Sequence, residues 1–125
     1  SIRLSATAEE TAALIKKAKT DSERYITYDP GNRPAVSNLI NLIALASGAT
    51  PKAIAQDIGA GGAGKLKAML TETLNESLRP LRARRKELES NMDYIRAVLL
   101  AGVKQARFVA EQTLMEVRQV MNMAL

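Results

Sequence analysis

The stretch PAVSNLINLIALASG, residues 34–48, decides how the fold of this chain is interpreted. Pro34 suits the first turn of a helix, and Gly48 suits the position just after its end. Between them, apolar side chains cover most of a helical circumference, which is typical of a helix in the middle of a domain. The stretch therefore predicts a helix over residues 34–47 that is buried on nearly all sides by other helices.

The segments on both sides of this stretch also carry helix signals. Only 3% of the residues are aromatic, while Ala, Leu, Glu, Lys and Arg are plentiful, so helix propensity is high throughout. We predict an all-α fold, a bundle of about five helices with a long C-terminal helix. One further helix falls within residues 5–19, capped by Ser5 or Thr7, and another spans 51–58, capped by Thr50. A fourth helix runs from about Gly64 through Pro80, and the last helix follows a cap at Ser90 or Asn91. Pro80 predicts a kink in the fourth helix or a break into two pieces.

A polar connector, residues 19–35, separates the first two predicted helices. It contains RYITY, which could form a short extended piece, and DPGN, which is typical of a turn. We expect residues 1–125 to form a single domain around this connector. The chain opens with SIRL and not with Met, so we expect a processed chain or a fragment.

Several function classes are excluded by composition. The chain has no Cys and no His, so it lacks thiol nucleophiles, zinc ligands of the N/S type, and the commonest general base at neutral pH. We predict no catalytic residues, no metal site and no cofactor in this chain. No apolar run reaches the roughly 18 residues of a membrane span, and no signal peptide is recognisable, so we expect no membrane partner and a cytoplasmic location.

The glycine-rich stretch GAGGAGK, residues 59–65, matches two nucleotide-binding patterns. Gly59, Gly64 and Lys65 fit the P-loop spacing, and the glycines alone fit the dinucleotide pattern. Both patterns need a strand before the loop, whereas a short helix is predicted here, and Leu66 stands where a P-loop has Ser or Thr. We interpret the stretch as a helix–helix connection, whose amides and lysines could still hold one backbone phosphate of a nucleic acid.

The positive charge of the chain is concentrated in one segment. Residues 65–86 contain seven basic and two acidic residues, so this segment carries the whole net charge of +5. A localised basic patch is typical of proteins that bind polyanions. The alternative is a solvated helix face whose arginines pair with neighbouring glutamates. The candidate phosphate-binding residues are Lys65, Lys67, Arg79, Arg82, Arg84, Arg85 and Lys86.

Two further interpretations of the chain stay open. The stretch AIAQDIG followed by a helix with two lysines resembles a helix–turn–helix of a DNA-binding regulator, although the predicted turn, Gly59 to Gly64, is longer than usual. The long C-terminal helix could instead make the chain a structural module that docks a partner through the small residues Gly102 and Ala106.

Four segments occur in an order that matches a known family. They are KKAKTDSE, PAVSNLINLIALASG, GAGGAGKLKAMLTETLNESLRPLRARRKEL and VLLAGVKQARFVAEQTLMEVRQVM. Together they resemble the C-terminal helical part of bacterial-type tryptophanyl-tRNA synthetases, which are class I enzymes. The resemblance covers essentially the whole chain.

The resemblance implies a division of labour within a longer enzyme. In this family a Rossmann-type catalytic domain with HIGH-like and KMSKS-like motifs activates tryptophan with ATP and Mg²⁺, and neither motif occurs in this chain. The helical part receives the anticodon region of tRNA-Trp. The resemblance therefore implies a tRNA-binding domain that is inactive alone, with the catalytic domain of the same polypeptide as its partner and a homodimeric parent enzyme.

Overall fold

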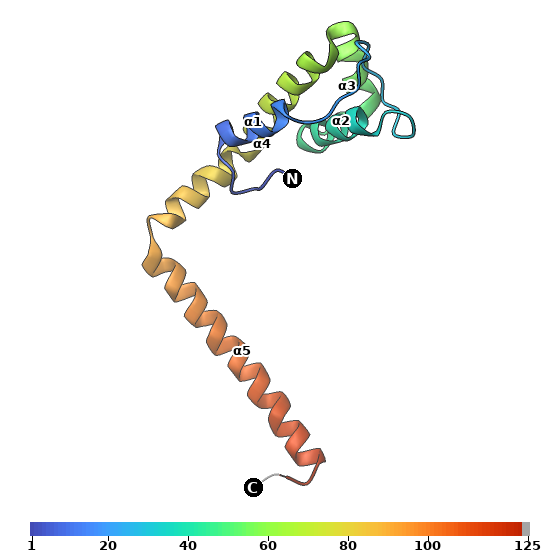
Figure 1. Cartoon of the computed structure of the whole chain (residues 1–125). Coiled ribbons are helices and arrows are strands. Elements are labelled where there is room, and N and C mark those ends of the chain that lie inside the picture. Colours follow the sequence, from blue (N-terminus) through green and yellow to red (C-terminus); the bar gives the residue numbers. More distant parts are fainter. Residues whose placement is uncertain (124–125) are drawn as a thin grey trace. The chain divides into compact units, whose positions relative to one another are not determined.

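The computed structural model describes residues 1–123, and this part of the chain contains helices and no strand (Figure 1). The helices are α1 (Ala8–Lys16), α2 (Pro34–Ser47), α3 (Pro51–Ile58), the short 3₁₀ helix η1 (Gly59–Gly61), α4 (Gly62–Glu89) and α5 (Met92–Val120). The predicted all-α fold with a long C-terminal helix is confirmed. Contacts between residues divide the chain into two units: unit 1 is Ser1–Ala83, and unit 2 begins at Arg84.

Local capping interactions fix where the helices begin. Thr7 and Glu10 form a reciprocal capping box, in which the Thr7 hydroxyl accepts from the Glu10 N–H at 3.1 Å and the Glu10 carboxylate accepts from the Thr7 N–H at 2.9 Å. The Asn91 side chain accepts a backbone N–H in the first turn of α5. Of the predicted alternatives, the caps are therefore Thr7 and not Ser5, and Asn91 and not Ser90.

The core of unit 1 is built around one face of α2. This face meets apolar residues of α1, the connector, α3 and α4. The buried apolar residues are Ile15, Ile26, Val36, Leu39, Ile40, Ile43, Ile54, Ala55, Ile58, Leu66 and Leu70. The expectation that α2 is covered on nearly all sides is wrong, because Leu45 is 84% exposed and Leu42 is only partly buried. The neighbouring helices of unit 1 cover one side of α2 and leave the other side open.

The connection between α3 and α4 is shorter than the sequence suggested. Gly59 and Gly62 have backbone φ angles of +48° and +74°, a region that residues other than glycine rarely adopt. These two residues bracket η1, and α4 already begins at Gly62 and not near Gly64. The glycines therefore allow two helices to be joined by a single turn.

Helix α4 continues through Pro80 without a break, so the predicted break into two pieces does not occur. A proline inside a helix removes one backbone hydrogen bond, here to the carbonyl four residues earlier. Both sides of Pro80 keep helical geometry, and the helix ends only at Glu89.

The connector is held in place by the side chain of Arg33, which is only 7% exposed. Its guanidinium binds both carboxylate oxygens of Asp21, at 2.6 and 2.7 Å, and donates to the Tyr25 carbonyl and the Thr27 hydroxyl at 2.8 Å each. Residues 24–28 form no strand, in contrast to the extended piece considered for RYITY. The predicted turn at Asp29 is present, where the carboxylate accepts two backbone N–H groups.

The Asp21–Arg33 pair predicts an acid-sensitive fold. Hydrogen bonds from Arg33 lower the pKa of Asp21 below its usual value. A carboxylate with a lowered folded-state pKa stabilises the fold above its unfolded pKa, about 3.9, and this stabilisation is lost as the pH falls through the folded pKa. Asp21→Asn should therefore lose less stability than the unmodified chain when urea unfolding is compared at pH 6 and pH 3. An equal loss in both proteins would contradict this role.

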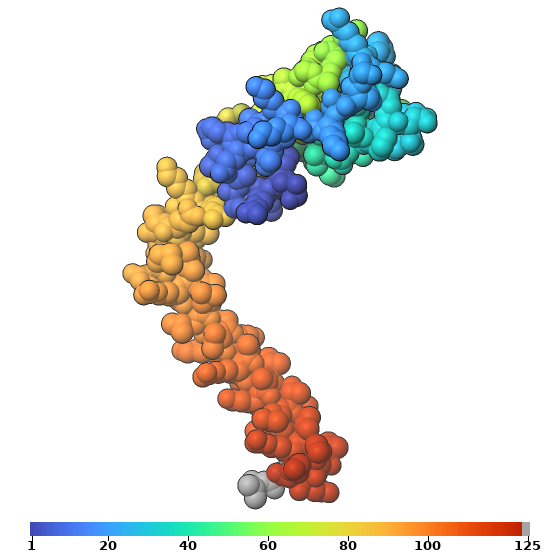
Figure 2. All heavy atoms as spheres, in the orientation of Figure 1, coloured from blue at the N-terminus to red at the C-terminus, as the bar shows by residue number. Residues whose placement is uncertain are grey.

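Unit 2 contains the end of α4 and the 29-residue helix α5. Apolar residues recur along the whole of α5, which is drawn in orange and red in Figure 2, but none of its residues is buried. Leu99, Phe108 and Val120 are 63, 64 and 86% exposed, and Gly102 and Ala106 are exposed as well. Within residues 1–123, no helix combines the length and the apolar character that a bilayer span requires.

Candidate nucleic-acid interface

All seven predicted phosphate-binding residues lie on α4, and the structure divides them by what their side chains do. Lys65, Lys67 and Arg82 donate to backbone carbonyls of unit 1, so the fold itself uses them. The remaining residues are exposed on the surface of the helix, and these are Arg79, Arg84, Arg85 and Lys86.

The two lysines at the start of α4 bind the ends of neighbouring helices. Lys65 donates to the Asp57 carbonyl in the last turn of α3 at 2.7 Å, and Lys67 donates to the Lys16 carbonyl in the last turn of α1 at 3.0 Å. Cations are favourable at helix C-termini, because the last carbonyls have no intrahelical partner and the helix dipole is negative there. Each ammonium has three donors, so a phosphate could still be bound beside these carbonyls.

Arg82 has the most internal contacts of the seven residues. Its guanidinium donates to the Ala6 carbonyl at 3.0 Å, the Asn75 side-chain oxygen at 2.8 Å and the Thr11 hydroxyl at 2.9 Å, with a longer bond to the Thr7 carbonyl. Thr11 is fully buried. Arg82 therefore anchors the start of α1 to α4, which leaves little of its hydrogen-bonding capacity for a ligand.

The exposed arginines form ion pairs with glutamates one helical turn away. Arg84 binds Glu87 at 2.8 Å, Arg85 binds Glu89 at 2.7 Å, and Arg79 binds Glu76. The hydrogen bond to Glu87 raises the pKa of Arg84. Solvent screens exposed pairs of this kind and makes them weak, so an incoming phosphate can replace the glutamate at little cost. Lys86 is exposed and belongs to none of the ion pairs in the described part of the chain.

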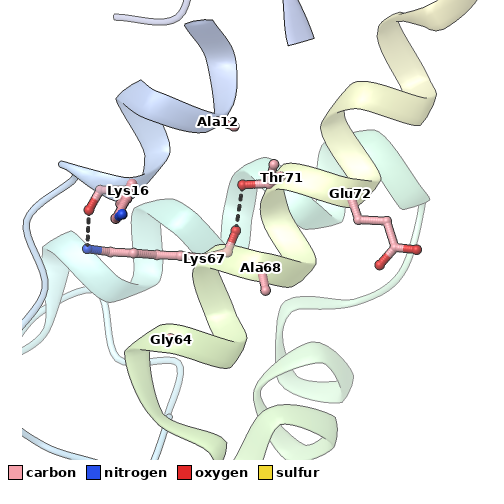
Figure 3. Close-up of a pocket in the computed structure, with 7 residues that line it drawn as sticks. All are labelled: Ala12, Lys16, Gly64, Lys67, Ala68, Thr71 and Glu72. Carbon is pink, nitrogen blue, oxygen red and sulfur yellow. Dashed lines mark hydrogen bonds between the residues drawn. The ribbon is translucent and has the colours of Figure 1, made fainter. Parts of the chain in front are cut away.

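A shallow groove runs between α1 and α4 in unit 1, with a volume of about 520 Å³ (Figure 3). Its lining includes the small residues Ala12, Gly64 and Ala68. Lys16 lies at one end and Glu72 at the other. Sequence reasoning did not select Lys16, because a basic residue in the last turn of a helix is common without any ligand. Its position beside Lys67 becomes visible only when α1 lies against α4.

The glycine stretch has the surroundings expected of a helix–helix connection. Helix α3 leads into it, and the ammonium of Lys65 is turned to the Asp57 carbonyl. A P-loop would instead follow a strand and direct its lysine to the β- and γ-phosphates of a nucleotide.

The short connection between α3 and α4 also bears on the helix–turn–helix alternative. Since η1 has only three residues, the objection that the turn is too long is wrong. The burial of Leu66 and Leu70 argues against a recognition helix, because it shows that the inner face of the first turns of α4 is used for packing.

These features define an all-α chain with an exposed basic segment on one long helix. A family model described as tRNA synthetases class I (W and Y) matches residues 1–79. The chain belongs to this family of class I tRNA synthetases.

The most similar curated relatives include several bacterial tryptophan–tRNA ligases. The chain is 32% identical to the tryptophan–tRNA ligase of Nostoc sp. over 91% of this chain and 34% of the relative. It is 36% identical to the tryptophan–tRNA ligase of Synechocystis sp. over 86% of this chain and 32% of the relative. It is 38% identical to tryptophan–tRNA ligase 1 of Streptomyces avermitilis over 82% of this chain and 30% of the relative. The chain spans about a third of the length of these relatives.

Proposed function

We propose that this chain is the tRNA-binding part of a tryptophan–tRNA ligase and that it receives the anticodon region of tRNA-Trp. The observation that carries the proposal is the group of exposed cations in the C-terminal part of α4. Arg79, Arg84, Arg85 and Lys86 are exposed cations in a chain whose net charge comes entirely from residues 65–86. Contacts between cations and phosphates dominate the affinity of most nucleic-acid-binding proteins.

The geometry of α4 supports phosphate contacts more strongly than base recognition by these residues. Arg84 and Arg85 are adjacent on a helix, so they project on different sides and can follow a backbone, and they hold only weak surface pairs. Lys65 and Lys67 lie in the first turns of α4 and can add contacts there. The guanidinium of Arg82 already donates to four acceptors within the chain, so Arg82 can contact a phosphate only through its remaining N–H group.

In this proposal the chemistry of the parent enzyme belongs to another part of the polypeptide. Activation of tryptophan with ATP and Mg²⁺ takes place in a catalytic domain with HIGH-like and KMSKS-like motifs, which this sequence does not contain. The chain acts by positioning tRNA for that domain, within a parent enzyme that is a homodimer in the cytoplasm. By itself it is expected to catalyse no reaction.

Competition between tRNAs tests the proposed function. Labelled tRNA-Trp is bound to the chain and displaced by unlabelled tRNA-Trp or by the same tRNA with a substituted anticodon. We expect the substituted tRNA to compete several-fold less well, because base contacts distinguish it while phosphate contacts do not. Equal competition by both tRNAs would contradict a role at the anticodon.

The interpretation of residues 59–65 as a connection predicts that the chain does not bind ATP. Calorimetric titration of ATP with Mg²⁺ should show no saturable heat for the unmodified chain or for Lys65→Ala. The reason is that Lys65 is directed to the Asp57 carbonyl and a helix precedes the glycines. Saturable binding that is lost in Lys65→Ala would restore the P-loop interpretation.

A further inference from the structure

A second, smaller groove of unit 1 lies between the connector and α3. It has a volume of about 190 Å³, and its lining includes Tyr25, Tyr28, Lys52 and Gln56. The whole chain contains only four aromatic residues, three Tyr and one Phe, so half of them line this one groove. Figure 1 shows the connector (light blue) passing beside α3.

The ring of Tyr25 is exposed although the backbone that carries it is fixed. Tyr25 is 60% exposed, whereas the next residue, Ile26, is 1% exposed and belongs to the core. The Ile26 N–H donates to the Gly59 carbonyl at 2.8 Å, and Arg33 donates to the Tyr25 carbonyl at 2.8 Å. A ligand that stacks on this ring would not have to order the loop first, and ordering a loop is a common cost of binding.

The polar residues of the groove suit a nucleic acid better than an apolar partner. Lys52 offers a cation for a phosphate, and the amide of Gln56 both donates and accepts hydrogen bonds, as the edges of bases require. The volume is below the roughly 300–1,000 Å³ of pockets for drug-sized ligands, so the groove suits one flat ring. Proteins that recognise unpaired RNA bases typically stack them on aromatic side chains.

We propose that this groove binds one unpaired RNA base, which stacks on Tyr25 while Lys52 contacts a neighbouring phosphate. The proposal rests on the proposed tRNA-binding function and adds a second contact site to it. In this arrangement α4 supplies contacts to phosphates that do not depend on sequence, and the Tyr25 groove supplies a contact that depends on the presence of a base.

Abasic substitution combined with mutation tests this proposal. The probe is the anticodon stem-loop RNA of tRNA-Trp, intact or with a single abasic site at each loop position in turn. For the unmodified chain we expect one loop position where the abasic site weakens binding about five-fold or more, since stacking of one base typically contributes that much or more. Tyr25→Ala should weaken binding of the intact RNA by a similar factor and abolish the effect of the abasic site.

Three control variants sharpen this experiment. Tyr25→Phe keeps the ring and should keep most of the affinity. Tyr94→Ala removes a comparably exposed tyrosine from α5 and should bind like the unmodified chain. Lys52→Gln should make the slope of log affinity against log salt concentration shallower by about 0.7, as expected when one phosphate contact with a single strand is lost.

The outcomes separate this proposal from the function on which it rests. An abasic penalty that persists unchanged in Tyr25→Ala would place the base elsewhere and overturn the proposal, while tRNA binding stands. Absence of any abasic effect would mean that the groove binds no base, which overturns the proposal while tRNA binding stands. If the unmodified chain does not bind the intact stem-loop at all, the proposed function and the groove assignment both fail.

Discussion

Replacing Ile40 with Ala should lower the free energy of unfolding of unit 1 by about 2–5 kcal/mol, the usual loss for truncating a fully buried aliphatic side chain. Ile40 lies on the buried face of α2 and has no exposed surface. Its removal leaves a cavity where α2 meets the rest of the core, and the surrounding helices can close this cavity only in part. Hydrogen exchange of amides in α2 and α3 measures the loss.

Leu45→Ala is the matched control for this prediction. It lies on the same helix, but it is 84% exposed, so its truncation should change the stability by less than about 0.5 kcal/mol. Equal losses for Ile40→Ala and Leu45→Ala would mean that the open side of α2 is covered in solution. The core would then be larger than the helices of unit 1 alone provide.

The second large effect is expected on binding of tRNA. Neutralising the four exposed cations of α4, with Arg79, Arg84, Arg85 and Lys86 replaced by Gln, should weaken binding of tRNA-Trp and flatten its salt dependence. Each phosphate contact that is lost reduces the slope of log affinity against log salt concentration by roughly 0.7–0.9, so the loss of four contacts reduces this slope by about 3. Between 50 and 200 mM salt, this corresponds to roughly a hundred-fold difference in affinity.

The chain offers a charge-matched control on α5. A variant with Arg96, Lys104, Arg107 and Arg118 replaced by Gln also loses four exposed positive charges. If only the total charge matters, both variants should behave alike. The account predicts that the α5 variant keeps most of the salt slope, and a loss as large as that of the α4 variant would contradict the assignment of the interface to α4.

Arg82→Gln should behave differently from the other arginine variants. Its main effect is expected on the stability of unit 1, because the side chain holds Ala6 and Thr11 against α4. Urea unfolding together with the salt slope of RNA binding distinguishes the two roles. A variant of unchanged stability and reduced salt slope would show that Arg82 contacts RNA after all.

Features set by neighbouring residues could be predicted from the sequence. Pro34 and Gly48 mark the ends of α2, Thr50 marks the start of α3, and Ser90 or Asn91 marks the start of α5, because each of these signals acts within one turn of a helix. The all-α fold follows from propensity and apolar spacing alone, which are also local properties.

Features set by residues far apart in the sequence could not be predicted. Three of the four partners of Arg82 lie 71 to 76 residues earlier in the chain, so its place in a run of basic residues suggested a surface role. The exposure of Leu45 likewise depends on which helices pack against α2. The groove beside Tyr25 forms because Ile26 binds the Gly59 carbonyl, a contact that no local pattern indicates.

Direct binding of this chain to the labelled anticodon stem-loop of tRNA-Trp tests the central claim most directly. The experiment is done at low and at moderate salt, against a stem-loop with a scrambled loop sequence and against a DNA duplex. We predict a clear preference for the cognate loop that persists at moderate salt, together with weaker binding of all three ligands at higher salt. Equal affinity for all three ligands, or a preference for the DNA duplex, would contradict the claim that this chain receives the anticodon of tRNA-Trp.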